Sequence, residues 1–200
     1  ETMTDHYAFA AAATVCGPVV GTTERFPVHR IYCVGRDYEE HAKEMGLTVS
    51  CDLNYRKKLW SWGKTATEVM SELVAYSDLA IGNEEDADKV FGIRAPEVDV
   101  TKGNVEADAY VYVCSKLHER FPNLKTIAIT LRGSLSASHN SWSGILWHEG
   151  QTYVAPRYDI THIVDRVGGG DSFGAGLIYS LLTSEDKQRA IDFATAASCL

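Results

Sequence analysis

Long apolar runs, an excess of basic residues and paired cysteines are all missing from this 200-residue chain. No apolar stretch reaches the roughly 18 residues that a membrane-spanning helix needs, and no basic segment precedes the small apolar stretch at 7–20, so neither a membrane span nor a signal peptide is predicted. The five cysteines are odd in number and none form a CxxC pair, which is typical of reduced thiols in a cytoplasmic protein. With 19 Lys and Arg against 27 Asp and Glu, the net charge of −8 argues against nucleic-acid binding.

What the chain does have, after residue 46, is an alternation of strand-like and helix-like segments. Apolar or β-branched stretches predict strands at 47–53, 79–82 and 126–131, and helical patterns are found at 67–76, 83–91, 105–120, 171–182 and 185–198. Short segments at 134–137, 143–147 and 152–155, separated by turn residues, predict an antiparallel edge. The alternation predicts an α/β fold with a mainly parallel sheet covered by helices.

The strongest functional signal is the segment 165–176, which reads DRVGGGDSFGAG. Three successive glycines let backbone N–H groups converge on one point, and they stand where a helix begins, so they predict an anion hole suited to a phosphate in transfer. Asp171 lies at the same helix start, where positive potential favours the ionised form that accepts a proton from a hydroxyl. A plain glycine turn with Asp171 as helix cap is the alternative. The small residues at 174–176, which allow close helix–sheet packing, favour the functional interpretation.

This segment resembles the second signature of the ribokinase-like (PfkB) carbohydrate kinases, which usually carry alanine where Gly169 stands. Three more segments resemble motifs of that family in the same order. Residues 50–60 (SCDLNYRKKLW) resemble its Asp-x-Asn-x-Arg strand end, residues 81–87 (IGNEEDA) its Asn-x-x-Glu motif, and residues 127–133 (IAITLRG) the strand and loop that contact the nucleotide. Between the motifs the sequence is most similar to 2-keto-3-deoxygluconate kinases. The resemblance covers about residues 47–200 and implies a ribokinase-like fold, incomplete relative to the family.

The resemblance also implies a set of roles around ATP, Mg²⁺ and a sugar acid such as 2-keto-3-deoxygluconate. The implied catalytic groups are the base Asp171 and the backbone of Gly168, Gly169 and Gly170 as anion hole. Substrate contacts fall to Asn54 and to Arg56, whose planar guanidinium suits a carboxylate. Nucleotide contacts are expected from Asn83, Thr130, Arg132 and Gly133, and Mg²⁺ is expected to be organised indirectly by Asn83 and Asp86.

Each of these side chains has a structural alternative. Arg56 can be a surface ion pair, and the acidic stretch from Asn83 to Asp86 can serve only to cap a helix. Thr130 and Arg132 can belong to a buried strand end.

The N-terminal segment is of another kind. Residues 26–46 resemble the start of fumarylacetoacetate hydrolase-family enzymes, especially fumarylpyruvate hydrolases, and predict a strand at 31–34 and a helix at 37–45. In that family a His and a Glu matching His41 and Glu44 activate water, and their spacing places both on one helix face. A solvent-facing pair is the preferred interpretation. We therefore expect two parts, a hydrolase-like segment at 1–46 and a ribokinase-like portion at 47–200, fused near residues 42–46.

Three functions remain in competition: a sugar kinase, a metal-dependent acylpyruvate hydrolase that uses His41 and Glu44, and a non-catalytic fusion fragment. The half of the kinase fold that carries the lid and most sugar contacts has no counterpart in the chain, and the chain stops within a helix. Because phosphoryl transfer depends on positioning and on excluding water, we expect weak or no activity. The expected partners are the sugar acid and ATP, without nucleic acid or membrane. Homo-oligomer formation is left open.

Overall fold

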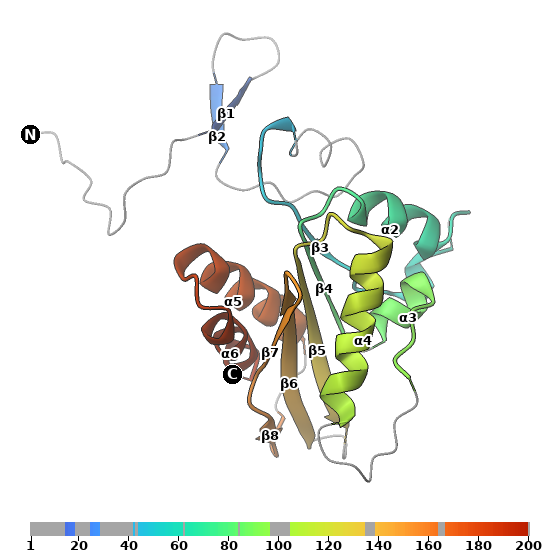
Figure 1. Ribbon diagram of the computed structural model, residues 1–200, viewed down its shortest axis with the longest axis vertical. Helices are drawn as coiled ribbons and strands as arrows, with labels where there is room; N and C mark the ends of the chain where they lie inside the picture. The colour runs from blue at the N-terminus through green and yellow to red at the C-terminus, as the bar shows by residue number, and fades with distance from the viewer. Residues whose placement is uncertain are drawn as a thin grey trace, which may run out of the picture.

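The structure is a computed structural model (Figure 1), and it describes residues 15–18, 25–28, 42, 44–61, 63–83, 85–96, 105–134, 139–163 and 167–199. Near the N-terminus, β1 (Val15–Pro18) and β2 (Arg25–Val28) form a two-stranded antiparallel sheet. The predicted strand at 31–34 and most of the predicted helix at 37–45 lie outside the described residues.

The main sheet has six strands in the order β3-β4-β5-β6-β7, with β8 also paired to β6. Their bounds are β3 (Ser50–Asp52), β4 (Leu79–Asn83), β5 (Thr126–Ser134), β6 (Asn140–His148), β7 (Gln151–Val154) and β8 (Tyr158–Ile160). β3, β4 and β5 run parallel, whereas β6, β7 and β8 pair antiparallel. The predicted parallel sheet with an antiparallel edge is therefore confirmed, although β6 is longer than predicted and β8 was not predicted.

Helices cover both faces of this sheet (Figure 1). One face carries α2 (Ala66–Val74), α3 (Asp86–Phe91) and α4 (Val105–Arg120), and the other carries α5 (Gly169–Thr183) and α6 (Lys187–Ala197). A short 3-10 helix, η1 (Lys57–Leu59), follows β3. No helix in the described ranges combines the length and apolarity needed to cross a membrane.

The alternation of side chains along the strands divides the core into two clusters. In β5, Ile127 and Ile129 pack in the cluster with α2, α3 and α4, whereas Ala128 between them packs with Phe173 and Leu177 of α5. Burying an aliphatic or aromatic side chain of this size contributes about 1.5–3 kcal/mol. The sheet is therefore held from both sides, and its strand ends form a fixed frame.

Local sequence signals explain where the helices begin and end. Thr65 and Glu68 form a capping box at the start of α2, because each side chain accepts a hydrogen bond from the other residue's backbone N–H. Asp186 caps α6 by accepting from the N–H of Arg189 at 3.0 Å. α3 ends at Gly92, which takes a left-handed conformation (φ 71°) that favours glycine.

The small residues that follow the glycine loop pack in two directions. A Cβ on Gly174 would lie 3.8 Å from Ile81 Cδ1 of β4, in keeping with the predicted helix–sheet packing. A Cβ on Gly176 would instead lie 3.1 Å from the Cα of Ala194 and 3.2 Å from the Cβ of Ala197. Gly176 therefore serves the close approach of α5 to α6, a helix–helix contact that the sequence pattern did not distinguish from helix–sheet packing.

Candidate active site

The predicted substrate and nucleotide residues gather at one edge of the sheet. Because β3, β4 and β5 are parallel, their carboxyl ends meet at the same edge, where α/β proteins bind ligands. Asp52 ends β3, and Asn83 ends β4 and lies opposite Thr130 of β5 in the register. The exposed side chains of Asn54 and Arg56 follow β3 in the adjoining loop. The topology thus brings together residues that lie far apart in the sequence.

Asn83 and Asp86 are tied into the backbone at this edge. The Asn83 side-chain oxygen accepts hydrogen bonds from the N–H groups of Glu85 (2.8 Å) and Asp86 (3.0 Å) in the turn before α3, whose N-terminal cap is Glu85 rather than Asn83. The Asp86 carboxylate, only 3% exposed, accepts from the N–H groups of Asn83 (2.9 Å) and Tyr55 (3.0 Å). The oxygens of both residues are therefore engaged within the protein, and their role toward Mg²⁺ stays a prediction.

Electrostatics connects this edge to the start of α5. Loss of hydration around the Asp52 carboxyl group, together with the nearby charges of Asp86 and Asp171, raises its pKa to about 6, although part of the side chain still reaches the surface. The backbone N–H of Asn54, 3.1 Å from Asp52 Oδ1, and the charge of Arg56 act in the opposite direction. Asp171 is thus close enough to the end of β3 for its charge to raise the pKa of Asp52.

The glycine turn is open toward solvent. Gly168 adopts a left-handed conformation (φ 84°, ψ 0°) as the N-terminal cap of α5, and Ser172 N–H donates to its carbonyl at 2.8 Å. A Cβ on Gly168, Gly169 or Gly170 would meet no atom within 4 Å, and Asp171 is exposed. The first N–H groups of a helix have no partner within it, and among the described residues those of 169–171 have no other acceptor. This backbone is available to an anion.

The three predicted nucleotide residues on β5 differ in their surroundings. Thr130 is 6% exposed, and its hydroxyl donates weakly to Gly82 O at 3.4 Å. Arg132 is exposed. It lies two residues further along β5 and therefore on the same sheet face as Thr130, the face that carries α5 and α6. Gly133 leaves room for the neighbouring strand β6, because a Cβ there would collide with Ser141 Oγ. Their contacts with a nucleotide stay predictions.

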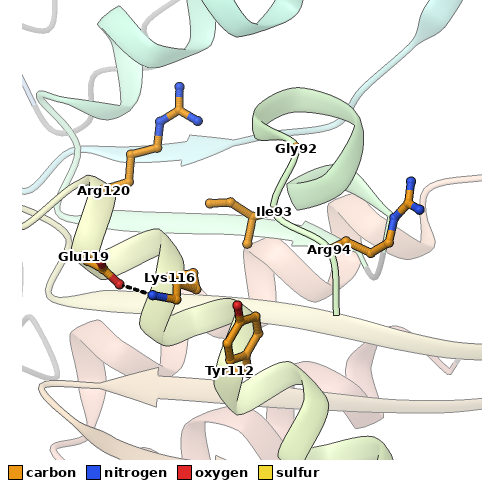
Figure 2. A pocket seen from close by; sticks show the side chains of 7 residues that line it. All are labelled: Gly92, Ile93, Arg94, Tyr112, Lys116, Glu119 and Arg120. Atoms are coloured by element: carbon orange, nitrogen blue, oxygen red, sulfur yellow. Dashed lines mark hydrogen bonds and ion pairs between the residues drawn. The ribbon is translucent and has the colours of Figure 1, made fainter. Parts of the chain in front are cut away.

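A separate cavity of about 490 Å³ lies between α4 and the segment after α3, and Figure 2 shows its lining. No predicted site residue lines it. Its basic side chains already have protein partners: Lys116 pairs with Glu119, and Arg120 donates to Phe91 O at 3.0 Å. The cavity therefore gives no support for an anion site.

The structure offers little to test the predicted hydrolase-like segment or a metal site. His41 lies outside the described residues, and Glu44 is exposed, so the hydrolase-like pair and the boundary after residue 46 stay predictions. Within the described part of the chain, no group of three or more His, Cys, Asp or Glu side chains is arranged to hold a metal ion.

Asp52 is the site residue for which sequence reasoning assigned no role. In the sequence, Asp52 is the first residue of the Asp-x-Asn-x-Arg segment and lies two residues before Asn54. Its place at the end of a strand was the available signal, because strand ends at this edge point into the site.

Comparison with known proteins agrees with this geometry. The family profile described as pfkB family carbohydrate kinase matches residues 34–200. A 5-dehydro-2-deoxygluconokinase of Photobacterium profundum is 26% identical over 162 residues, which cover 80% of this chain and 43% of that protein. A 2-dehydro-3-deoxygalactonokinase of Haloferax volcanii is 28% identical over 159 residues, covering 80% and 42%. The chain therefore spans less than half the length of these curated relatives.

A solved structure has higher sequence identity than these relatives. The crystal structure of 2-dehydro-3-deoxygluconokinase from Thermotoga maritima matches with a TM-score of 0.72 and 46% identity, covering 82% of this chain and 47% of that one. A PfkB family carbohydrate kinase from Listeria grayi matches with a TM-score of 0.70 and 31% identity over the same shares. Fold, motif order and family profile agree, and the chain belongs to the pfkB family of carbohydrate kinases.

Proposed function

We propose that this chain carries the phosphoryl-transfer centre of a sugar kinase that moves the γ-phosphoryl group of ATP onto a hydroxyl of a sugar acid such as 2-keto-3-deoxygluconate. Family membership supports the reaction class. The names of similar proteins, 2-dehydro-3-deoxygluconokinase at 46% identity and 2-dehydro-3-deoxygalactonokinase at 28%, support a keto-deoxy sugar acid as acceptor.

One arrangement carries the proposal: Asp171 lies in the open first turn of α5, and its charge reaches Asp52 at the end of β3, the strand that leads into the loop with Arg56. A carboxylate, a set of amides that have no acceptor among the described residues and a guanidinium therefore lie near one edge of the sheet. This combination can hold an acceptor by its carboxylate, take a proton from its hydroxyl and receive a phosphate.

The proposed reaction follows from these positions. Asp171 accepts the proton of the attacking hydroxyl as the new bond from its oxygen to the γ-phosphorus forms and the bond to the ADP oxygen breaks. Backbone N–H groups at 168–171 stabilise the negative charge on the transferring group, helped by the positive end of the α5 dipole. Arg56 binds the sugar acid's carboxylate and fixes which hydroxyl faces Asp171.

Mg²⁺ enters such reactions with the nucleotide, whose phosphate charge it neutralises. The oxygens of Asn83 and Asp86 already accept backbone hydrogen bonds and Asp86 is 3% exposed, so any role of these side chains toward Mg²⁺ would be an indirect one. No step of the proposed reaction depends on a metal ion bound by this chain.

The test combines ATP titration with a coupled ADP-release assay that uses 2-keto-3-deoxygluconate as acceptor. We expect Asp171→Asn to retain ATP binding while ADP release falls by about 10²–10⁴-fold, the usual contribution of a positioned base. Asp192→Asn on α6 is the matched control and should keep both properties. Turnover retained in Asp171→Asn would refute the assignment. Pyruvate formed from added fumarylpyruvate and Mg²⁺ would instead support the hydrolase alternative.

A further inference from the structure

The Asp86 carboxylate joins two separate segments of the backbone. Oδ2 accepts from the N–H of Asn83 at the end of β4 (2.9 Å), and Oδ1 accepts from the N–H of Tyr55 in the loop after β3 (3.0 Å). The side chain is 3% exposed, so water does not replace these bonds readily. Asp86 therefore acts as a clamp between the β3 loop and the β4 end.

The clamp lies where the pairing of β3 with β4 stops. The last backbone bond between them runs from Leu53 N–H to Ile81 O (2.8 Å). Asn54 then takes a positive φ of 23°, which turns the chain away from the hydrogen-bonded pair of β3 and β4. Its N–H donates to Asp52 Oδ1. Tyr55 N–H comes next, and a partly buried N–H is stabilised by an acceptor from the protein. Asp86 supplies that acceptor from the helix that follows the neighbouring strand.

Arg56 immediately follows the clamped residue. Burial raises the pKa of Asp86, while the N–H groups of Asn83 and Tyr55 and the charge of Arg56 lower it. The guanidinium thus lies within electrostatic reach of the carboxylate that holds its own backbone.

We infer that Asp86 is a positioning residue that sets the backbone at Tyr55, and through it places Arg56 to receive the carboxylate of the acceptor. This inference rests on the proposed function, because it assigns Asp86 to the acceptor side of that reaction. It departs from the expectation that the residue organises Mg²⁺ on the nucleotide side. Both carboxylate oxygens face backbone amides, which is the geometry of a structural clamp.

The test uses Asp86→Asn, which has nearly the same shape but offers only one acceptor oxygen and turns an NH₂ group toward an amide. Binding of 2-keto-3-deoxygluconate is measured by calorimetry without nucleotide or metal, and amide hydrogen exchange of Tyr55 is measured alongside. We expect at least tenfold weaker binding and faster Tyr55 exchange. Asp88→Asn, a change on the same helix away from the clamp, is the matched control and should leave both unchanged.

A double-mutant cycle separates positioning from metal binding. If Asp86 acts through Arg56, then Asp86→Asn should weaken acid binding far less in an Arg56→Ala chain than in the wild type. Equal effects in the two backgrounds, or unchanged acid binding with a raised Mg²⁺ requirement in the kinase assay, would overturn the inference. Asp86→Glu keeps the charge but moves the carboxylate by one methylene, and it decides the question if Asp86→Asn does not fold. It should shift the Tyr55 and Arg56 amide resonances and weaken acid binding relative to the wild type, and unchanged resonances with unchanged binding would overturn the inference.

The two proposals can fail separately. A wild-type chain that binds no sugar acid and releases no ADP would refute the proposed function, and with it the acceptor role of Asp86. Tyr55 exchange decides the clamp itself without any ligand. Wild-type acid binding that survives in Asp86→Asn would refute only the inference.

Discussion

Alanine substitutions along the glycine turn should separate folding from phosphoryl transfer. Gly168 has φ 84°, whereas Gly169 and Gly170 lie outside the left-handed region, and a Cβ on any of the three would meet no protein atom within 4 Å. Packing therefore costs nothing at these positions. Only the backbone conformation and the space left for a ligand distinguish one substitution from another.

The expected changes in stability follow from these conformations. Gly168→Ala should lower the free energy of unfolding by about 1–2 kcal/mol, because a Cβ is strained at positive φ. Gly169→Ala and Gly170→Ala place a better helix former in the first turn of α5 and should raise it, by up to about 1 kcal/mol each.

The kinase activity of Gly169→Ala and Gly170→Ala should not change in parallel with their stability. Related kinases usually carry alanine where Gly169 stands, so Gly169→Ala should remain active and serves as the matched control for its neighbour. A Cβ on Gly170 meets no protein atom within 4 Å, so only a phosphate bound at this turn can be crowded by the added methyl, and Gly170→Ala should lower kcat or raise KM for ATP. Urea unfolding and the coupled ADP assay measure the two properties. A Gly170→Ala chain with wild-type turnover and KM for ATP would show that phosphate does not approach these amides.

Two further predictions concern the core and the charges of the site. Loss of hydration, with the charges of Asp86 and Asp171, raises the pKa of Asp52 to about 6, so the stability linked to its protonation is fully present below about pH 4 and is lost as the pH rises through about 6. Asp52→Asn should thus raise the free energy of unfolding at pH 7 and leave it unchanged near pH 4. Urea titrations at both pH values would contradict this if they showed equal shifts. Separately, a Cβ on Gly144 would lie 3.0 Å from Phe173 Cε2 and 3.1 Å from Ile191 Cδ1, so Gly144→Ala should destabilise by about 1–3 kcal/mol. Gly170→Ala, whose Cβ meets open space, is the matched control, and equal melting temperatures of Gly144→Ala and wild type would refute the packing argument.

Much of the fold was predictable because its signals are local. The helix at 105–120 was predicted with its observed bounds, and the parallel sheet with an antiparallel edge followed from alternating strand and helix patterns. The glycine turn before α5 was equally visible, since three successive glycines before an aspartate favour a tight turn at a helix start, whereas its binding of an anion stays a prediction. The lengths of the strands could be predicted less well from the sequence. β3 is shorter than predicted and β6 longer, because pairing partners rather than propensity decide where a strand stops.

By itself, the sequence determined most of the elements after residue 46, the motifs and the family, since each depends on residues that are neighbours in the chain. Tertiary structure alone decided which of those motifs act together. The charges of Asp86 and Asp171 raise the pKa of Asp52 only because parallel pairing brings the ends of β3 and β4 to one edge and the packing of α5 brings its first turn near them. The partners of Asp86 were likewise beyond prediction. A carboxylate at a helix start serves a metal, a ligand or a backbone amide equally well until the fold shows which of these lies within about 3 Å.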